Sequence, residues 1–344
     1  MGTSKQIIEI GSGTILRVIL FLLLLAFLYF IRNILAIAIF SVVIASAVEP
    51  AAAWFAQRKI PRVIGVLITY IAAFIVLTAA FSLVVPPLFS QFSSLATDIP
   101  AFIENVTEPT VLAEYFPSLP SSIGNLLGSI GQDLSQAISG LSGDFFQTAS
   151  GVFGGALSLF IIIVLSFYLS VQENGIESFL RVVTPLHYEE YVLSVWRRSK
   201  RKIGRWMRGQ ILLGVLVGVM SFLGLAILQV DFALSLAILA GVFELIPMFG
   251  ATLAAIPAVI LAFLQEPILG LLVLALYIII QQIENNLIYP IVMRKAIGVH
   301  PALVILSMII GAQMGGVAGV LLAVPIVVVL VEISNDIIAE KHTT

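Results

Sequence analysis

The chain has 344 residues, of which 60% are hydrophobic and 10% are charged, and its mean hydropathy is +1.12. Soluble domains carry about a quarter charged residues, so this composition excludes a soluble domain and predicts a polytopic membrane protein. The net charge is −2 and the chain has no cysteine, which excludes disulfides, thiolate metal sites and cysteine nucleophiles.

Apolar segments long enough to cross a bilayer recur along the chain. None shows the alternating pattern of a barrel strand, so we expect an all-α fold of about eight hydrophobic segments. The first segment lacks a small-residue cleavage site, which predicts a retained helix rather than a signal peptide. The segments lie at 14–31, 34–54, 63–85, 151–171, 209–229, 232–264, 268–290 and 302–331.

Lysine and arginine indicate which loops face the cytoplasm. The connections 57–62 and 172–208 are rich in both and are expected inside, together with the N-terminus. Region 86–150 has acidic residues but no lysine or arginine, so it is expected outside. Within it, apolar residues recur every three or four positions from Ile123 to Phe145, which predicts an amphipathic helix on the membrane surface or against a neighbouring subunit.

The two longest apolar stretches, 232–264 and 302–331, are expected to be broken or re-entrant hairpins. A single crossing by the first would place the basic pair 294–295 outside, whereas a hairpin returns that pair, and finally the C-terminus, to the cytoplasm. Each stretch has helix breakers at its centre, "IPMFG" (246–250) and "GAQMGGVAG" (311–319). The alternative is that these glycines serve close helix packing.

The two stretches also resemble each other. "TLAAIPAVIL" (252–261) aligns with "VLLAVPIVVV" (320–329), and Pro257 falls opposite Pro325. Each stretch follows a single span, and the expected topology gives the two units opposite orientations. Inverted repeats with broken helices are typical of secondary transporters.

An ionisable residue inside an apolar segment predicts a function, because burying it is costly. Glu244 lies three residues before Pro247 in the first expected break, which Gly250 closes. Unwound backbone there could help Glu244 to bind a cation or a proton. The alternative is that Glu244 only caps free amides in the turn.

A second polar group follows the apolar run of segment 268–290. Gln281, Glu284 and Asn285 are expected to share one helical face, with Asn286 beside them. One carboxylate and several amides suit a polyhydroxylated ligand or a desolvated cation. Because Pro290 is expected to end this helix, the alternatives are a polar helix end at the headgroup level or a cap on the adjacent hairpin tip.

Gln313 at the second break is a further candidate of the same kind. The basic run 196–210 predicts an interfacial cytoplasmic helix on anionic lipid rather than a nucleic-acid site. The arginines of this helix are expected to form one face, and its tryptophans and terminal glutamine are expected at the interface. These residues are Arg197, Arg201, Arg205 and Arg208, then Trp196, Trp206 and Gln210.

Enzyme motifs are not evident. "GLSG" (140–143) has the form of a serine-protease motif, but neither His187 nor His300 lies in a span to act as base. The histidines lack metal-ligand spacing, and no phosphate-binding glycine loop occurs. We therefore expect no enzyme, no nucleic-acid partner and no cofactor, apart from a transported Na⁺ or H⁺.

Several motifs together resemble the autoinducer-2 exporter (AI-2E) family of bacterial and archaeal membrane proteins. They are "RKIPR", "VVPPLFSQ", "RWMRGQILLGVLVG", "FELIPMFGATLAAIPA", "QQIENNLIYPIVM", "IGVHPALVIL" and "GGVAGVLLAVP", in this order along the chain. The resemblance implies membrane transport, with export of the quorum-sensing furanone autoinducer-2 in some members and sodium or lithium exchange for protons in others. It also implies homo-oligomers, pentamers among them. Because members can carry asparagine at the position of Glu244, Glu284 is the safer residue to carry over.

The sequence thus predicts an ion-gradient-driven secondary transporter of the inner membrane that exports a small polar solute such as autoinducer-2. The alternatives are a Na⁺(Li⁺)/H⁺ antiporter and, from another class, a non-transporting oligomeric scaffold. The expected partners are the lipid bilayer, the solute or monovalent cation, and further copies of the chain. The expected units are N-terminal transmembrane helices (1–85), an external helical region (86–150), a span with the basic helix (151–204) and the transport unit (205–344).

Overall fold

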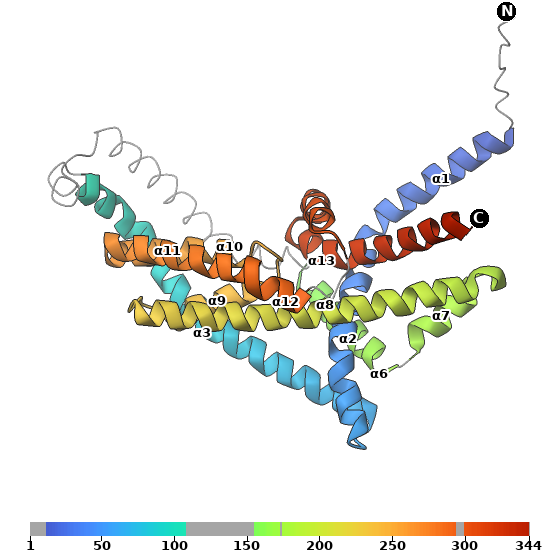
Figure 1. Cartoon of the computed structure of the whole chain (residues 1–344), viewed down its shortest axis with the longest axis horizontal. Coiled ribbons are helices and arrows are strands. Elements are labelled where there is room, and N and C mark those ends of the chain that lie inside the picture. Colours follow the sequence, from blue (N-terminus) through green and yellow to red (C-terminus); the bar gives the residue numbers. More distant parts are fainter. Residues whose placement is uncertain (1–11, 108–154, 173, 294–298, 344) are drawn as a thin grey trace, which may run out of the picture.

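The computed structural model describes residues 12–107, 155–172, 174–293 and 299–343. Within these ranges every regular element is a helix, which confirms the all-α class (Figure 1). Among these described residues five helices are long and apolar enough to cross a membrane, or six spans if one bent pair counts as a crossing. The expected amphipathic face from Ile123 to Phe145 lies outside the described residues.

The N-terminal part consists of α1 (Ser12–Phe30), α2 (Arg32–Gln57) and α3 (Arg62–Thr107), as the first three apolar segments predict. α3 has 46 residues, which corresponds to about 69 Å at 1.5 Å per residue. The hydrocarbon core of a bilayer is only about 30 Å thick. The helix therefore runs well past residue 85, where the span was expected to end, and projects away from the other helices (Figure 1).

Hydrogen bonds from hydroxyl groups connect α2 and α3 to α6 (Ala156–Val171), which packs against both. The Tyr70 hydroxyl donates to Oγ of Ser166 at 2.8 Å, and Oγ of Ser41 reaches the backbone oxygen of Ile162 at 3.3 Å. Hydrogen bonds between helices help to hold membrane bundles together, where apolar side chains gain little by leaving lipid. These three helices form a scaffold beside the C-terminal half.

α7 (Gly175–Val183) leads into α8 (Leu186–Ile227), one uninterrupted helix that carries both the basic run and the next apolar segment. One face of α8 packs against α2 and α13, while the arginines at 201, 205 and 208 are exposed. The expected interface positions of Trp206 and Gln210 are therefore wrong, because both side chains are buried. Trp206 belongs to a core cluster with Val43 of α2 and Val328 of α13.

The first expected hairpin is formed by α9 (Ala233–Phe243) and α10 (Gly250–Gln265). The backbone N–H of Asp231 donates to Oε1 of Gln265 at 3.2 Å, although 34 residues separate them. A continuous helix would hold such residues about 51 Å apart. The chain therefore doubles back between α9 and α10, at the break predicted from "IPMFG". Neither arm, of 11 and 16 residues, reaches the length of about 20 that a span needs.

The second hairpin is α13 (Pro301–Thr343), which is interrupted at Gly315 and Gly316. Gly316 has φ +57° and ψ −139°, a conformation that essentially only glycine adopts. Gly311 and Gly319, on either side of this break, lie against each other, since a Cβ on either would collide with the backbone oxygen of the other. In a straight helix they would be about 12 Å apart, so the chain reverses here too, as Figure 1 shows.

The order of elements matches the expected repeat. α8 precedes the first hairpin, and α11 (Pro267–Ile283) with its continuation to Met293 precedes the second. Pro257 and Pro325 each lie inside the second arm of a hairpin, at corresponding places. Two span-plus-hairpin units therefore make up the C-terminal half of the described chain.

The first hairpin gives a direct prediction. In the Asp231→Cys/Gln265→Cys double variant a short bifunctional thiol reagent should join the two positions within one chain, because the arms end side by side. The parent has no cysteine, so the background is clean. Mass spectrometry of the cross-linked peptides reads the yield, and Asp231→Cys/Met248→Cys, which pairs an arm end with the hairpin tip, should give almost none. Equal yields would contradict the hairpin.

Candidate functional site

Two buried carboxyl groups meet at the first break. Glu244 follows the last residue of α9, Glu284 follows the last residue of α11, and their side chains are 0% and 1% exposed. The two carboxyl groups lie close enough to act on each other electrostatically, and no basic side chain of the described residues acts on either. Oε2 of Glu244 and both carboxyl oxygens of Glu284 are buried without a hydrogen-bond partner among the described residues. Two carboxylates without a counter-charge cannot both stay ionised in a low-dielectric interior. The pair therefore requires a proton or a bound cation.

The backbone changes from α-helix to π-helix at Glu284. Residues Glu284–Ile288 form a π-helix, η1, between α11 and α12 (Tyr289–Met293). At the start of this wider turn Glu284 is buried, whereas Asn285 and Asn286 are exposed. The expected common face of Gln281, Glu284 and Asn285 is wrong to this extent. Such π-segments occur frequently at functional sites.

Pro290 does not end this helix, contrary to the sequence-based expectation. It is the second residue of α12, and the helix continues to Met293. Proline removes one helical N–H and its ring clashes with the carbonyl of the preceding turn. The π-helix immediately before it loosens that turn, which accounts for how the proline is accommodated.

The break itself brings the start of α10 against Glu244. Gly250 is required there, because a Cβ would collide with the Glu244 backbone and lie 2.6 Å from its Oε2 atom. Pro247 is buried in the same turn. The backbone N–H of Ala251, in the first turn of α10, acts on the Glu244 carboxyl, and a helix N-terminus favours negative charge. No side-chain cap hydrogen bond forms at the start of α10, so the capping role considered for Glu244 stays a prediction.

Gln210 is the third buried polar residue of the site, and the sequence analysis missed it. Its Nε2 donates to the backbone oxygen of Glu244 and lies 3.5 Å from Oε1 of that residue. Gly214 and Gly241 permit this approach of α8 to α9, since a Cβ on Gly214 would lie 2.6 Å from the Gly241 oxygen. A signal was present in the sequence: Gln210 continues the buried row of α8 at spacings of three or four, through Ile203, Trp206, Gln210, Leu213 and Val217.

The other candidates lie around the pair rather than in it. Gln281 accepts from Thr252 at 3.0 Å and donates to the Met248 oxygen at 3.4 Å, so it ties α11 to the break. Asn286 donates to the side chain of Gln282 at 2.8 Å on the exposed side. Gln313 is exposed at the second break. The structure thus brings together Glu244, Glu284 and Gln210, with Pro247, Gly250 and Gln281 as their immediate support.

Replacing Gln210 by alanine should lower the stability of the protein by about 1–3 kcal/mol, because the buried carbonyl of Glu244 loses its donor. Thermal unfolding of the purified protein measures the effect. Gln172→Ala is the matched control, because Gln172 is exposed and its side chain donates to the Tyr168 hydroxyl at 2.8 Å on the surface. A Gln210→Ala variant as stable as the control would show that the hydrogen bond is unimportant.

Broken helices that meet around buried acids in a polytopic bundle are typical of membrane transporters. The family model described as "AI-2E family transporter" matches residues 18–339. The chain therefore belongs to this family, which confirms the resemblance drawn from its motifs.

Similar proteins carry names of the same class. YueF of Bacillus subtilis (strain 168), named as a transport protein, is 28% identical over 282 residues, which cover 80% of this chain and 76% of YueF. YhhT of Escherichia coli (strain K12), also named as a transport protein, is 24% identical over 320 residues, covering 92% and 88%. PerM of the same strain, named as a permease, is 24% identical over 271 residues, covering 76% and 74%.

Proposed function

We propose that the protein is an ion-gradient-driven secondary transporter of the inner membrane, and that the Glu244–Glu284 pair binds the coupling ion. The observation that carries this proposal is that two neighbouring carboxyl groups are fully buried without a basic partner, and that three of their four oxygens have no hydrogen-bond partner among the described residues. Removing such groups from water costs several kcal/mol each. A non-transporting scaffold would gain nothing from this cost, whereas a transporter needs a site that changes charge.

The pair suits exchange between a proton and a monovalent cation. A shared proton lets one carboxyl donate to the other, while a Na⁺ ion could be held by carboxylate oxygens and by backbone oxygens at the adjacent break. Both ions satisfy the same charge requirement, so each excludes the other. Competition for one site is the basis of antiport, which makes cation/proton exchange the function that the geometry favours most.

Export of a small polar solute driven by this exchange remains part of the proposal. The family description and the names of the relatives support a transported solute without identifying it. Gln281 links the ion site to the break, so a change of protonation could alter the packing of the first hairpin. The basic loops 57–62 and 172–208 support cytoplasmic termini in this proposal.

Reconstitution separates the possibilities. Proteoliposomes with an outward Na⁺ gradient and an internal pH dye should report proton uptake as Na⁺ leaves. A parallel assay with loaded autoinducer-2 should report whether efflux accelerates in the same gradient. Proton flux alone would assign antiport, flux coupled to efflux would assign solute export, and neither flux would contradict the proposed function. Empty liposomes are the control for leakage.

A further inference from the structure

An exposed stripe of side chains along α8 changes from basic to aliphatic half-way along the helix. It runs at alternating spacings of four and three, and every member is exposed: Arg201, Arg205, Arg208, Leu212, Val215 and Val219. The aliphatic members are 49%, 58% and 52% exposed. One helical face therefore presents guanidinium groups and continues directly as a hydrocarbon surface.

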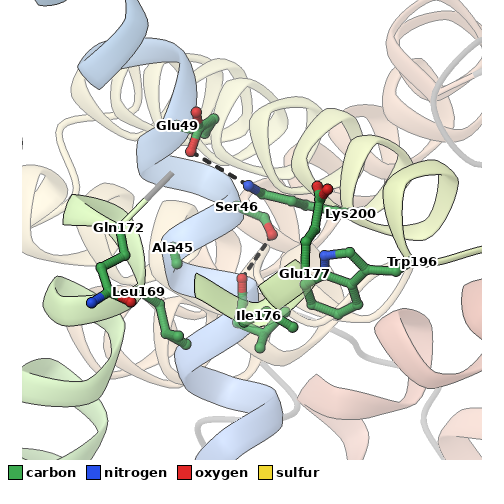
Figure 2. A pocket seen from close by; sticks show the side chains of 10 residues that line it. Ala45, Ser46, Glu49, Leu169, Gln172, Ile176, Glu177, Trp196 and Lys200 are labelled. Carbon is green, nitrogen blue, oxygen red and sulfur yellow. Dashed lines mark hydrogen bonds and ion pairs between the residues drawn. The ribbon is translucent and has the colours of Figure 1, made fainter. Parts of the chain in front are cut away.

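The arginine half of this stripe borders a cavity of about 400 Å³ between α2, α7 and α8. Five basic and two acidic side chains line it, a surplus of three positive charges. Both acids already have partners: Glu49 forms an ion pair with Lys200 (Figure 2), at 3.7 Å, and Glu177 lies 2.6 Å from Arg197. Arg201 and Arg208 form no ion pair within the described residues and can therefore hold an anionic ligand.

The cavity lies where both helices change from polar to apolar. α2 and α8 are in close contact there, since a Cβ on Gly204 would lie 2.8 Å from the backbone oxygen of Ser46. The apolar run of α2 ends at Glu49, and that of α8 begins at Ile211. In a membrane this level corresponds to the headgroups on the side of the basic loops.

We propose that this cavity binds the headgroup of an anionic phospholipid, with Arg201 and Arg208 holding the phosphate. Arginine presents a planar fork of donors that matches phosphate oxygens. The acyl chains would then follow Leu212, Val215 and Val219 into the bilayer. This hydrocarbon continuation favours a lipid over a free anion, and the site is independent of the carboxyl pair and of the proposed transport.

Native mass spectrometry of the purified full chain tests the site. The Arg201→Gln/Arg208→Gln variant should bind phosphatidylglycerol at least about tenfold more weakly than the parent, because charge-assisted hydrogen bonds are lost. Arg58→Gln/Lys59→Asn is the matched control, since it removes two exposed charges outside the cavity, and asparagine tolerates the positive φ of 63° at position 59. Arg201→Lys/Arg208→Lys should retain part of the affinity.

Further comparisons in the same experiment identify the ligand. Phosphatidylglycerol should bind the parent more tightly than phosphatidylcholine does, and more tightly than its own deacylated, water-soluble headgroup. Equal loss of binding in the cavity variant and the control would show that the lipid is bound by the overall positive charge of the surface and not by the cavity. Equal affinity for the deacylated headgroup would assign a free-anion site instead. If a cavity variant lost a bound second copy of the chain and kept its affinity for lipid, the cavity would be a subunit interface. Any of these last three results would overturn the proposal.

Discussion

Replacing Glu284 by glutamine is expected to lower ion-coupled flux roughly 10- to 100-fold, because an ionic partner contributes about 1.5–3 kcal/mol and each 1.4 kcal/mol is tenfold. Glutamine keeps the size of the side chain but cannot release a proton or hold a cation by charge. The fold should survive, since the exchange removes an expensive buried acid. Flux in proteoliposomes measures the effect.

Glu266→Gln is the matched control for this variant. Glu266 is exposed just before α11 and has no side-chain cap hydrogen bond, so its neutralisation should leave flux unchanged. Glu244→Gln should be as damaging as Glu284→Gln, and the double variant should be no worse than either. Groups that act as one unit are strongly non-additive. Fully additive losses would show that the two carboxyl groups act separately.

Replacing Gly319 by alanine is expected to have the largest effect on the second hairpin. The new Cβ would collide with the backbone oxygen and carbon of Gly311, neither of which can rotate away as a side chain could. Overpacking a tight contact costs about 1–3 kcal/mol, and a rigid backbone neighbour places this case at the upper end. A clear fall in the Tm of the purified protein is the expected result.

Gly315→Ala supplies the comparison within the same hairpin. Gly315 has φ −146°, which other residues adopt, and a Cβ there would meet nothing within 4 Å. This variant should therefore unfold close to the parent temperature. If Gly319→Ala were equally stable, the two arms would not be in the close contact that the structure gives them.

The hairpins could be predicted from the sequence, because their causes are local and electrostatic. Proline and glycine mark the breaks, and the position of Arg294 and Lys295 requires the chain to return. Glu244 could be singled out as a lone acid in an apolar stretch. Glu284 could be singled out as well, but its pairing with Glu244 could not, because the pairing depends on how the first hairpin packs against α11, which no local pattern specifies.

The errors have physical causes as well. Asn285 was expected on the same face as Glu284 because residues three and four positions after Gln281 share one side of a helix, whereas the boundary between buried and exposed positions falls between Glu284 and Asn285. Gln210 was expected at the interface because of the arginines before it. Instead α8 stands against α2 and α13, and Arg198 and Lys202 are neutralised by Glu332, with Asp336 as a second partner of Arg198. The basic run 196–210 is therefore partly buried, because its partners lie on elements distant in the sequence.

The most direct test of the account is proton release on cation binding by the purified protein. When NaCl is added to weakly buffered, detergent-solubilised protein, displacement of the shared proton should release about one proton per chain, as metal binding to protonated ligands does. Choline chloride at the same concentration should release none. The Glu244→Gln/Glu284→Gln variant should show no sodium-specific release. Equal release by the parent and this variant, or none by the parent in sodium, would contradict the exchange of a proton for a cation at the buried carboxyl pair.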